Sequence, residues 1–274
     1  MLFTYDGIVV GRREIGDNSY FLDILTDEQG IVEATAHGAK KLNSSIQPSS
    51  ELFAYATFCL NKTKLRYSVN SARPKFSFHE VGKDIVKLAL ASYFAQVIRS
   101  CTPQEQEQHE SLVRFLAIAL YEIRSAAPHI PASIREALPE AAAATTENGR
   151  TLETVRAAFE LRFACMMGYR PDLRACANCG CYEPSENGGM FFLPDRGELF
   201  CGECFDREYG GECEKLLPDT LCAMRNIVFA PPERCFKFTL NSTAQAQLSF
   251  VAERYLLRRT ERGFSALSYY KSLL

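Results

Sequence analysis

The fold of the N-terminal region is decided by residues 7–41, which read GIVVGRREIGDNSYFLDILTDEQGIVEATAHGAKK. Three segments of this stretch are rich in β-branched and aromatic residues, and IGDNS and DEQG supply turn-forming residues between them. Two further segments of the same kind follow at residues 52–60 and 65–72. We therefore expect a mainly antiparallel sheet of five short strands. A closed barrel would remove the exposed edges of this sheet, and an open half of a sandwich is the main alternative.

The pattern of apolar residues changes after RPKFSF, residues 73–78. From there on apolar residues recur every three to four positions, which predicts amphipathic helices. The expected helices cover residues 81–100, 109–126, 151–167, 218–230 and 244–260. Gly168 followed by Pro171 is a stop signal for the third of them. Residues 126–149 show no convincing apolar stripe, and we interpret most of this segment as a connection.

The chain of 274 residues, 47% of them hydrophobic, is long enough for one large or two ordinary domains with a sizeable core. The change of pattern predicts a β-domain over residues 1–80 and a helical domain over residues 81–274. A cysteine-rich segment at about residues 172–210 interrupts the helical pattern, and we expect it to be an insertion in the helical domain.

The cysteine-rich segment contains two Cys-x-x-Cys pairs, CANC and CGEC. Two thiolates from one such turn can bind the same ion, and two pairs complete a tetrahedral zinc site. We predict one structural zinc ion with the ligands Cys176, Cys179, Cys201 and Cys204. Cys181 lies near enough in the sequence to replace Cys179 as a ligand. Thiols without a metal are one alternative, and a thioredoxin-like redox pair, which needs only one such motif, is another.

The number of cysteines and the distribution of apolar residues indicate the cellular compartment of the protein. Eleven cysteines, an odd number, make a poor disulfide framework, so we predict a reducing, cytoplasmic environment. There is no pattern typical of a signal peptide and no apolar run long enough to span a membrane, which predicts no membrane contact. Six cysteines are expected to be small core residues: Cys59, Cys101, Cys165, Cys213, Cys222 and Cys235.

The net charge of −2 hides a locally cationic stretch in the β-domain. Between His37 and Lys75 the only acid is Glu51, and a surface of this kind suits a polyanion. Solvated surface charge is the alternative interpretation of each of these cations. Asp17, Asp23 and Asp27 are expected at solvated turns. The candidate phosphate contacts are Lys40, Lys41, Lys62, Lys64 and Arg66, followed by Arg12 and Arg13.

Two further groups of side chains have competing interpretations. The aromatic residues Tyr20, Phe53, Tyr55 and Phe58 could stack on bases, but we expect them in the core. Arg254, Arg258, Arg259 and Arg262 form a second basic cluster on a predicted helix. This cluster suits a second nucleic-acid strand or an acidic peptide, and a solvated helix end is the alternative.

No catalytic pattern is found. The four histidines are scattered, and no glycine-rich phosphate loop precedes a helix. We therefore predict that the protein is not an enzyme.

In this order, the segments resemble a bacterial recombination-mediator family, RecO. The resemblance covers nearly the whole chain and is carried by residues 7–41, by FELRFACMMGYRPDLRACANCG and by CGEC. It implies an α+β multidomain fold, in which a five-stranded oligonucleotide-binding (OB-fold) barrel precedes an all-α domain with an inserted four-cysteine zinc finger. His37 departs from the family, which often has lysine there. Some members lack the cysteines, which implies that the zinc stabilises the fold and takes no part in the activity that the family shares.

The resemblance also implies a non-catalytic function in DNA repair and recombination, in the RecFOR pathway of the bacterial nucleoid. Members of the family bind single- and double-stranded DNA, anneal complementary strands and act with RecR. They help RecA to displace the single-stranded-DNA-binding protein, whose acidic C-terminal tail docks on the helical domain. A zinc-ribbon transcription or translation factor is an alternative, although the acids around the cysteines disfavour DNA contact there. A nuclease or glycosylase and a protein scaffold without DNA binding are further alternatives.

Overall fold

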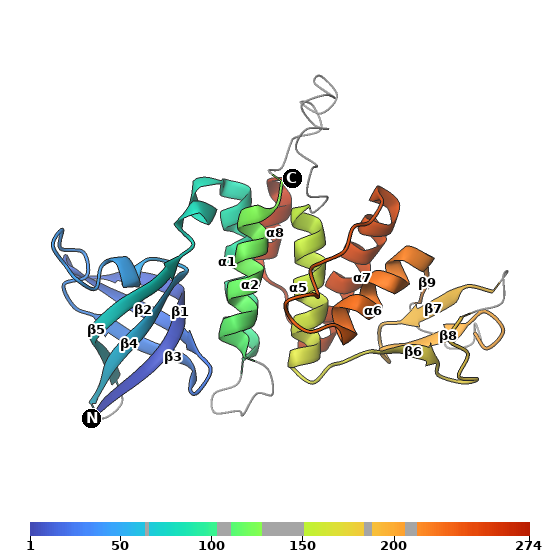
Figure 1. The fold of residues 1–274 in the computed structure, drawn as a ribbon, viewed down its shortest axis with the longest axis horizontal. Coiled ribbons are helices and arrows are strands. Elements are labelled where there is room, and N and C mark those ends of the chain that lie inside the picture. Colours follow the sequence, from blue (N-terminus) through green and yellow to red (C-terminus); the bar gives the residue numbers. More distant parts are fainter. Residues whose placement is uncertain (64–65, 103–110, 128–150, 184–187, 206–212) are drawn as a thin grey trace, which may run out of the picture. The chain divides into compact units, whose positions relative to one another are not determined.

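The computed structural model describes residues 1–63, 66–102, 111–127, 151–183, 188–205 and 213–274. The chain forms two compact units. The first consists of Met1–Ser125 and Phe264–Leu274, and the second of Ala126–Gly263. Figure 1 shows that the first unit contains a barrel and the helices α1, α2 and α8, whereas the second contains α5, α6, α7 and a small sheet.

The first unit begins with a closed five-stranded barrel in which the strands follow the order β1-β2-β3-β5-β4. Strands β3 and β5 pair in parallel, and the other neighbouring pairs are antiparallel. The closed barrel that the sequence predicts is therefore confirmed, and the open half of a sandwich is excluded. The strands are β1 (Leu2–Ile15), β2 (Ser19–Thr26), β3 (Gly30–Ala36), β4 (Ala54–Thr63) and β5 (Arg66–Ser77), with a short 3-10 helix, η1 (Pro48–Ser50), before β4.

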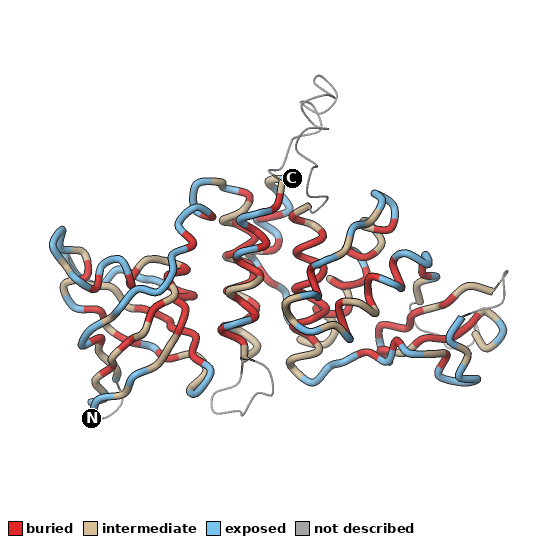
Figure 2. The backbone as a smooth tube through the Cα atoms, in the orientation of Figure 1, coloured by how far each residue is buried: buried red, intermediate tan, exposed pale blue. Residues whose placement is uncertain are grey.

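The barrel interior is filled by every second residue of its strands, as the alternating pattern predicts. Leu22 and Ile24 of β2 and Phe58 of β4 are wholly buried there. Figure 2 shows buried and exposed positions alternating along the strands of the barrel. Of the four aromatic residues expected in the core, Phe53 and Phe58 are buried. Tyr20 and Tyr55 are only partly buried, and Tyr20 packs against the edge of this core.

Helices α1 (Ile85–Cys101), α2 (Leu112–Ser125) and α8 (Ser265–Ser272) belong to the same unit as the barrel, and a 3-10 helix, η2 (His79–Lys83), leads into α1. The carboxylate of Asp84 caps α1 by accepting the backbone N–H of Val86 at 2.9 Å. Asp27, in the turn between β2 and β3, caps α2 by accepting the N–H of Val113 at 3.1 Å. Asp27 is exposed at a turn, as expected, and in addition it ties the barrel to a helix.

Asp23 is not at the solvated turn that the sequence analysis expects, since it is only 8% exposed and lies within β2. Arg13 of β1 and Arg99 of α1 each approach its carboxylate to 3.5 Å. A Cβ atom at Gly11 would lie 2.3 Å from one oxygen of Asp23 and 2.7 Å from Arg99. Glycine at this position therefore gives the ion pairs the room that they need between the barrel and α1.

The helices of the second unit are α5 (Leu152–Met166), α6 (Pro218–Phe229) and α7 (Ser242–Thr260). Their positions confirm the helices that the sequence predicts there. Helix α5 ends as expected, because Gly168 adopts a left-handed φ of 87° and Tyr169 N–H donates to Ala164 C=O at 2.9 Å. Helix α8 was not predicted, since its eight residues are too few to show a clear period.

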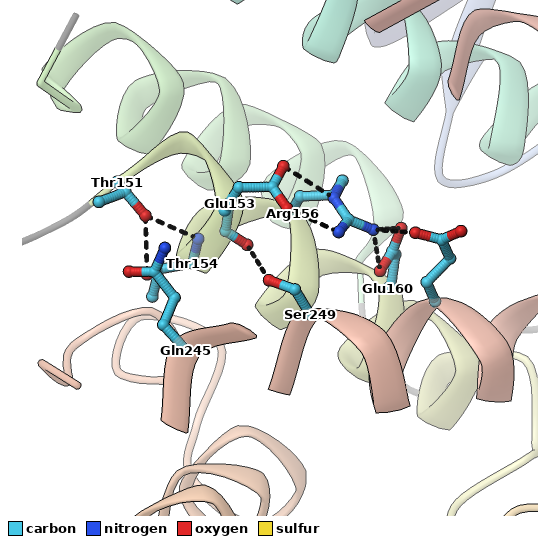
Figure 3. A network of polar contacts seen from close by, with 8 residues as sticks. Thr151, Glu153, Thr154, Arg156, Glu160, Gln245 and Ser249 are labelled. Atoms are coloured by element: carbon cyan, nitrogen blue, oxygen red, sulfur yellow. Dashed lines mark hydrogen bonds and ion pairs between the residues drawn. The ribbon is translucent and has the colours of Figure 1, made fainter. Parts of the chain in front are cut away.

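Helices α5 and α7 are joined by a polar network around Arg156, whose side chain is 3% exposed (Figure 3). Its guanidinium binds Glu153 at 2.7 Å, Glu160 at 2.9 Å and Glu253 of α7 at 2.8 Å. Burial alone would lower the pKa of Arg156, but the carboxylate of Glu160, followed by those of Glu153 and Glu253, raises it above its usual range. The network therefore keeps a charged arginine inside the helical layer. Beside it, Thr154 donates to Gln245 of α7 at 3.2 Å.

The cysteine-rich segment forms a four-stranded sheet in the order β6-β8-β7-β9. Its strands are β6 (Asp172–Cys176), β7 (Met190–Leu193), β8 (Glu198–Cys201) and β9 (Glu214–Leu216). The sequence analysis expected no strands in this segment, because runs of three to five residues carry little periodicity.

The domain boundary expected at residue 80 stays a prediction. The two compact units divide the chain at other positions, since α1, α2 and α8 belong to the same unit as the barrel. Most of the connection expected at residues 126–149 lies outside the described residues. Among the helices that the structure describes, none has the length and apolar character that crossing a membrane requires.

Candidate metal centre and nucleic-acid interface

The four predicted metal ligands come together because they follow two neighbouring strands. Cys176 is the last residue of β6 and Cys201 the last residue of β8. These strands are parallel, so the turns after them lie at the same edge of the sheet. Each turn is closed by hydrogen bonds to the first cysteine: Gly180 N–H donates to Cys176 C=O at 2.9 Å, and Cys204 N–H donates to Cys201 C=O at 3.0 Å.

The distances between the sulfur atoms fit a single tetrahedral ion. The Sγ atoms of Cys176, Cys179, Cys201 and Cys204 all lie within 4.8 Å of one another. Four sulfurs bound to one ion at about 2.3 Å would lie roughly 3.8 Å apart. The Sγ atoms of Cys179 and Cys201 are separated by 3.7 Å. The structure therefore confirms the cluster, and its donor set is that of a closed site with four thiolates.

The peptide groups of the two turns favour a thiolate at Cys176. Burial raises the pKa of this thiol, but the backbone N–H groups of Cys179, Cys201 and Asn178 more than offset the effect and lower it to about 6. Hydrogen bonds from Cys181, through its backbone and its thiol, lower the pKa of Cys179 as well. The turns thus support the deprotonated forms of Cys176 and Cys179 that metal binding requires. For Cys204, a hydrogen bond with Asn178 lowers the pKa, but contacts to the thiols of Cys179 and Cys201 outweigh it and raise the pKa to about 12.

Cys181 lies beside the cluster but is not one of its four members. Burial, together with contacts to the thiols of Cys179 and Cys201, raises the pKa of Cys181 to about 12. Its backbone C=O accepts the N–H of Cys176 at 2.9 Å, which helps to close the first turn. The geometry therefore favours Cys179 over Cys181 as the ligand. Of the six cysteines expected in the core, Cys235 is buried and Cys222 is exposed, so the expectation is wrong for Cys222.

Helix α7 holds the cysteine sheet through its arginines. Arg254 binds Glu214 of β9 at 3.3 Å, Arg258 forms an ion pair with Asp195, and Arg259 donates to Pro194 C=O at 3.2 Å. Phe192 of the sheet is wholly buried, and its ring lies 5.7 Å from that of Tyr255 of α7. Three arginines of the second basic cluster thus contact the sheet, and an additional role of that cluster stays a prediction.

The candidate phosphate contacts form two groups on the barrel. The first contains Arg12 and Lys40, whose charged groups lie 4.6 Å and 5.4 Å from the centre of the Tyr20 ring. Both cations have acidic partners: Arg12 binds Glu51 at 2.6 Å, and Lys40 binds Glu14 at 2.7 Å. The hydrogen bond from Lys40 lowers the pKa of Glu14. A phosphate that binds this group therefore competes with carboxylates of the protein.

The second group lies at the β4–β5 hairpin. Lys62 lies over the ring of Tyr67 at 5.0 Å, and Arg66 is exposed at the start of β5. Lys64 lies outside the described residues. The remaining two candidates belong with the first group: Arg13 is 64% exposed and lies over Phe21 at 4.8 Å, and Lys41 is exposed in the segment after β3.

Strand register places a row of paired residues between the regions of the barrel that hold the two groups. Arg13 of β1 pairs with Phe21 of β2, Phe21 with Thr35 of β3, Thr35 with Ser68 of β5, and Ser68 with Asn61 of β4. Paired residues point to the same face of a sheet. Four strand spacings of about 4.8 Å make this row roughly 19 Å long, a length that suits a few nucleotides crossing the strands. Of the candidate cations, Arg13 lies in this row, and Arg66, two residues before Ser68, shares its face. Arg12 and Lys62 pair with Leu22 and Tyr67 and so lie on the other face of their strands. The row and the candidate cations at its two ends are called the cationic band below.

Phe21 lies in this row, between Arg13 and Thr35, and was missed by the sequence analysis. It is only partly buried and shares its face with Thr35 and Ser68. The alternation of SYFLDILT contains the signal, because it places Phe21 on the other face of the strand from the buried Leu22 and Ile24.

Two family models match the chain, and they define it as a recombination protein. The model described as "Recombination protein O N terminal" matches residues 1–78, and "Recombination protein O C terminal" matches residues 146–268. Together they cover the barrel and most of the second unit.

Curated relatives match over nearly the full length. DNA repair protein RecO of Symbiobacterium thermophilum is 26% identical over 272 residues, which are 99% of this chain and 98% of the relative. RecO of Alkaliphilus metalliredigens is 26% identical over 276 residues and the whole of both chains, and RecO of Bacillus subtilis is 22% identical over 255 residues, or 93% and 88%. The chain belongs to the RecO family of DNA repair proteins. This is a family of recombination mediators without enzymatic activity, in agreement with the sequence analysis.

Proposed function

We propose that the protein binds single- and double-stranded DNA and anneals complementary strands. The observation that carries this proposal is the cationic band on the barrel, in which candidate cations lie over aromatic rings: Arg13 over Phe21, Arg12 and Lys40 over Tyr20, and Lys62 over Tyr67. A band of this kind tracks a phosphate backbone without reading base sequence. The candidates are those expected from the sequence: Lys40, Lys41, Lys62, Lys64, Arg66, Arg12 and Arg13.

The metal of the cysteine cluster is proposed to be one zinc ion with a structural role. Four thiolates favour zinc over harder ions such as magnesium and calcium, and their number leaves no open position for a substrate. When bound, the ion would fix the two turns to each other. No step of DNA binding depends on it, because the cluster belongs to the second unit and the cationic band to the first.

Membership of the RecO family supports a proposal about the protein partners of this chain. We propose that it acts with RecR to help RecA load on strands coated with single-stranded-DNA-binding protein, and that it receives the acidic C-terminal tail of that protein. The relatives are bacterial, which supports action at the nucleoid in the cytoplasm. The zinc-ribbon transcription or translation factor is not favoured, because both family models describe recombination proteins.

Annealing of coated strands tests this proposal. Complementary strands are first covered with single-stranded-DNA-binding protein, either intact or without its acidic tail, and duplex formation is then followed with and without the full chain. We expect the chain to accelerate annealing of strands coated with the intact protein, and to lose most of this effect when the tail is absent. A rate that does not respond to the chain on naked or coated strands would contradict the annealing function.

The acids that hold Arg12 and Lys40 are expected to weaken DNA binding. In the double variant Glu51→Gln and Glu14→Gln the two cations lose their competing carboxylates. We expect affinity for a single strand to rise about tenfold at low salt, and the slope of log K against log salt to steepen by up to about 0.7, for the phosphate contact that Arg12 adds to those of the native chain. Titration of a labelled oligonucleotide at several salt concentrations measures both quantities.

The control for this variant removes two exposed acids of the second unit, with Glu183→Gln and Glu261→Gln. It changes the net charge equally but leaves the barrel as it is. An equal gain of affinity in both variants would assign the effect to total charge and contradict competition at the band.

A further inference from the structure

Leu42 is the most exposed large apolar side chain among the described residues, with 99% of its surface open to solvent. It follows Lys40 and Lys41 in the segment between β3 and η1. A leucine in this state forgoes the favourable free energy of burying its apolar surface. The next such residues are Met1, at the chain end, and Leu2.

The backbone on both sides of Leu42 is fixed. Consecutive turns are closed by Lys41 N–H to Gly38 C=O at 3.1 Å and by Ser44 N–H to Lys41 C=O at 2.9 Å. Ala39 and Ile46, on either side, are 0% and 8% exposed and belong to the barrel core. Leu42 therefore projects from a segment that is held in place by hydrogen-bonded turns and by the burial of Ala39 and Ile46 in the barrel core.

The surroundings of Leu42 are polar and cationic. Lys40 N–H donates to Asn18 C=O at 3.2 Å and Gly38 N–H donates to the hydroxyl of Ser19 at 3.4 Å, so the segment lies against the β1–β2 turn. Lys41 is exposed and forms no ion pair with any described residue. The neighbours after Leu42 are Asn, Ser and Ser. An apolar protein partner would cover several apolar side chains, whereas here one leucine stands among groups that suit phosphates.

We propose that Leu42 packs against the unstacked bases of a single strand whose phosphates are bound by Lys40 and Lys41. The inference rests on the proposed DNA-binding function and adds to it a residue that contacts bases. Leucine is one of the apolar side chains that proteins insert between bases. The base faces of a single strand are already open, so the contact needs no unstacking of a duplex and reads no sequence. Leu42 would therefore favour single strands over duplexes.

The first test uses Leu42→Ser in the full chain. We expect about tenfold weaker binding of a single strand, from loss of part of the burial of one leucine. The slope of log K against log salt stays unchanged, because no charge is removed, whereas Lys41→Gln lowers its magnitude by about 0.7. Binding of duplex DNA and of an abasic oligonucleotide, which keeps the phosphates without the bases, changes less than about twofold. Ile85→Ser, at another exposed aliphatic residue of the first unit, is the matched control.

The second test uses a fluorescent residue at the same position. The chain contains no tryptophan, so Leu42→Trp introduces a unique one. Its emission is expected to be quenched by a single strand, through stacking on bases, and to be unchanged by the abasic oligonucleotide. Ile85→Trp is expected to respond to neither, although residue 85 is 54% exposed in the native chain.

The outcomes separate this inference from the proposed function. Salt-dependent binding by the native chain, with full single-strand affinity of Leu42→Ser and no quenching in Leu42→Trp, would overturn the base contact and leave the DNA-binding function in place. Full DNA affinity of Leu42→Ser combined with loss of RecR binding would assign the residue to a protein interface and overturn the inference as well. If the native chain binds no DNA at any salt concentration, the proposed function itself fails, and the base contact fails with it.

Discussion

Replacing Lys40, Lys41, Lys62 and Lys64 together by glutamine is expected to weaken binding of a single strand by a few hundred-fold at about 0.1 M salt. Each phosphate contact contributes about −0.7 to the slope of log K against log salt. Five contacts give a slope near −3.5 for the native chain, so a fourfold rise in salt should weaken its binding by about 100-fold. The variant keeps about one contact of the five, and its slope should approach −0.7. Oligonucleotide titrations between low and high salt measure both slopes.

The control for this variant loses the same number of charges elsewhere. Exposed cations outside the barrel are replaced with Lys83→Gln, Arg234→Gln, Lys237→Gln and Lys271→Gln. We expect this control to keep most of the affinity and a slope near that of the native chain. If the barrel variant folds, as judged by its circular dichroism and melting temperature, and binds as tightly as the native chain, the cationic band is not the DNA-binding site.

Two of the candidate cations on the barrel are already paired with acids of the protein, so the number of lysines alone does not predict the DNA affinity. Lys40 and Arg12 are held by Glu14 and Glu51, which lie 26 and 39 residues away in the sequence. Replacement of Lys40 therefore breaks its ion pair with Glu14 as well as a phosphate contact. Surface pairs of this kind contribute little to stability, so we expect the loss to appear in DNA affinity and its salt dependence, with folding largely unaffected.

The barrel and the cysteine cluster could be predicted because their signals are local. Alternation of apolar residues and the turns IGDNS and DEQG define the strands, and each Cys-x-x-Cys pair is a motif of four residues. The partners of charged residues could not be predicted, because they join distant segments. Asp27 caps a helix that begins 85 residues later, at Leu112, and Asp23 meets Arg99 of α1. The sheet around the cysteines was missed because its strands are very short and it packs against α7.

Removal of the metal is expected to have the largest effect on stability. Structural zinc sites contribute on the order of 10 kcal/mol in small domains, which is comparable with the stability of a whole domain. Chelation, or Cys179→Ser, should leave the two turns after β6 and β8 without their common ion. We expect a lower melting temperature and proteolytic cleavage within residues 172–205. The burial of Phe192 against α7 is expected to retain part of the sheet, so the loss should be smaller than the full metal-binding free energy.

The same variants test the ligand assignment and the separation of the two functions. Cys181→Ser should keep one metal ion per chain, measured by elemental analysis, because Cys181 is not a member of the cluster, whereas Cys179→Ser should lose it. Single-strand affinity should change less than about twofold on chelation, since the cationic band belongs to the other compact unit. Equal metal loss in both serine variants would contradict the choice of Cys179. A large fall in DNA affinity on chelation would show that the metal supports the interface, and that the barrel does not bind DNA independently of the second unit.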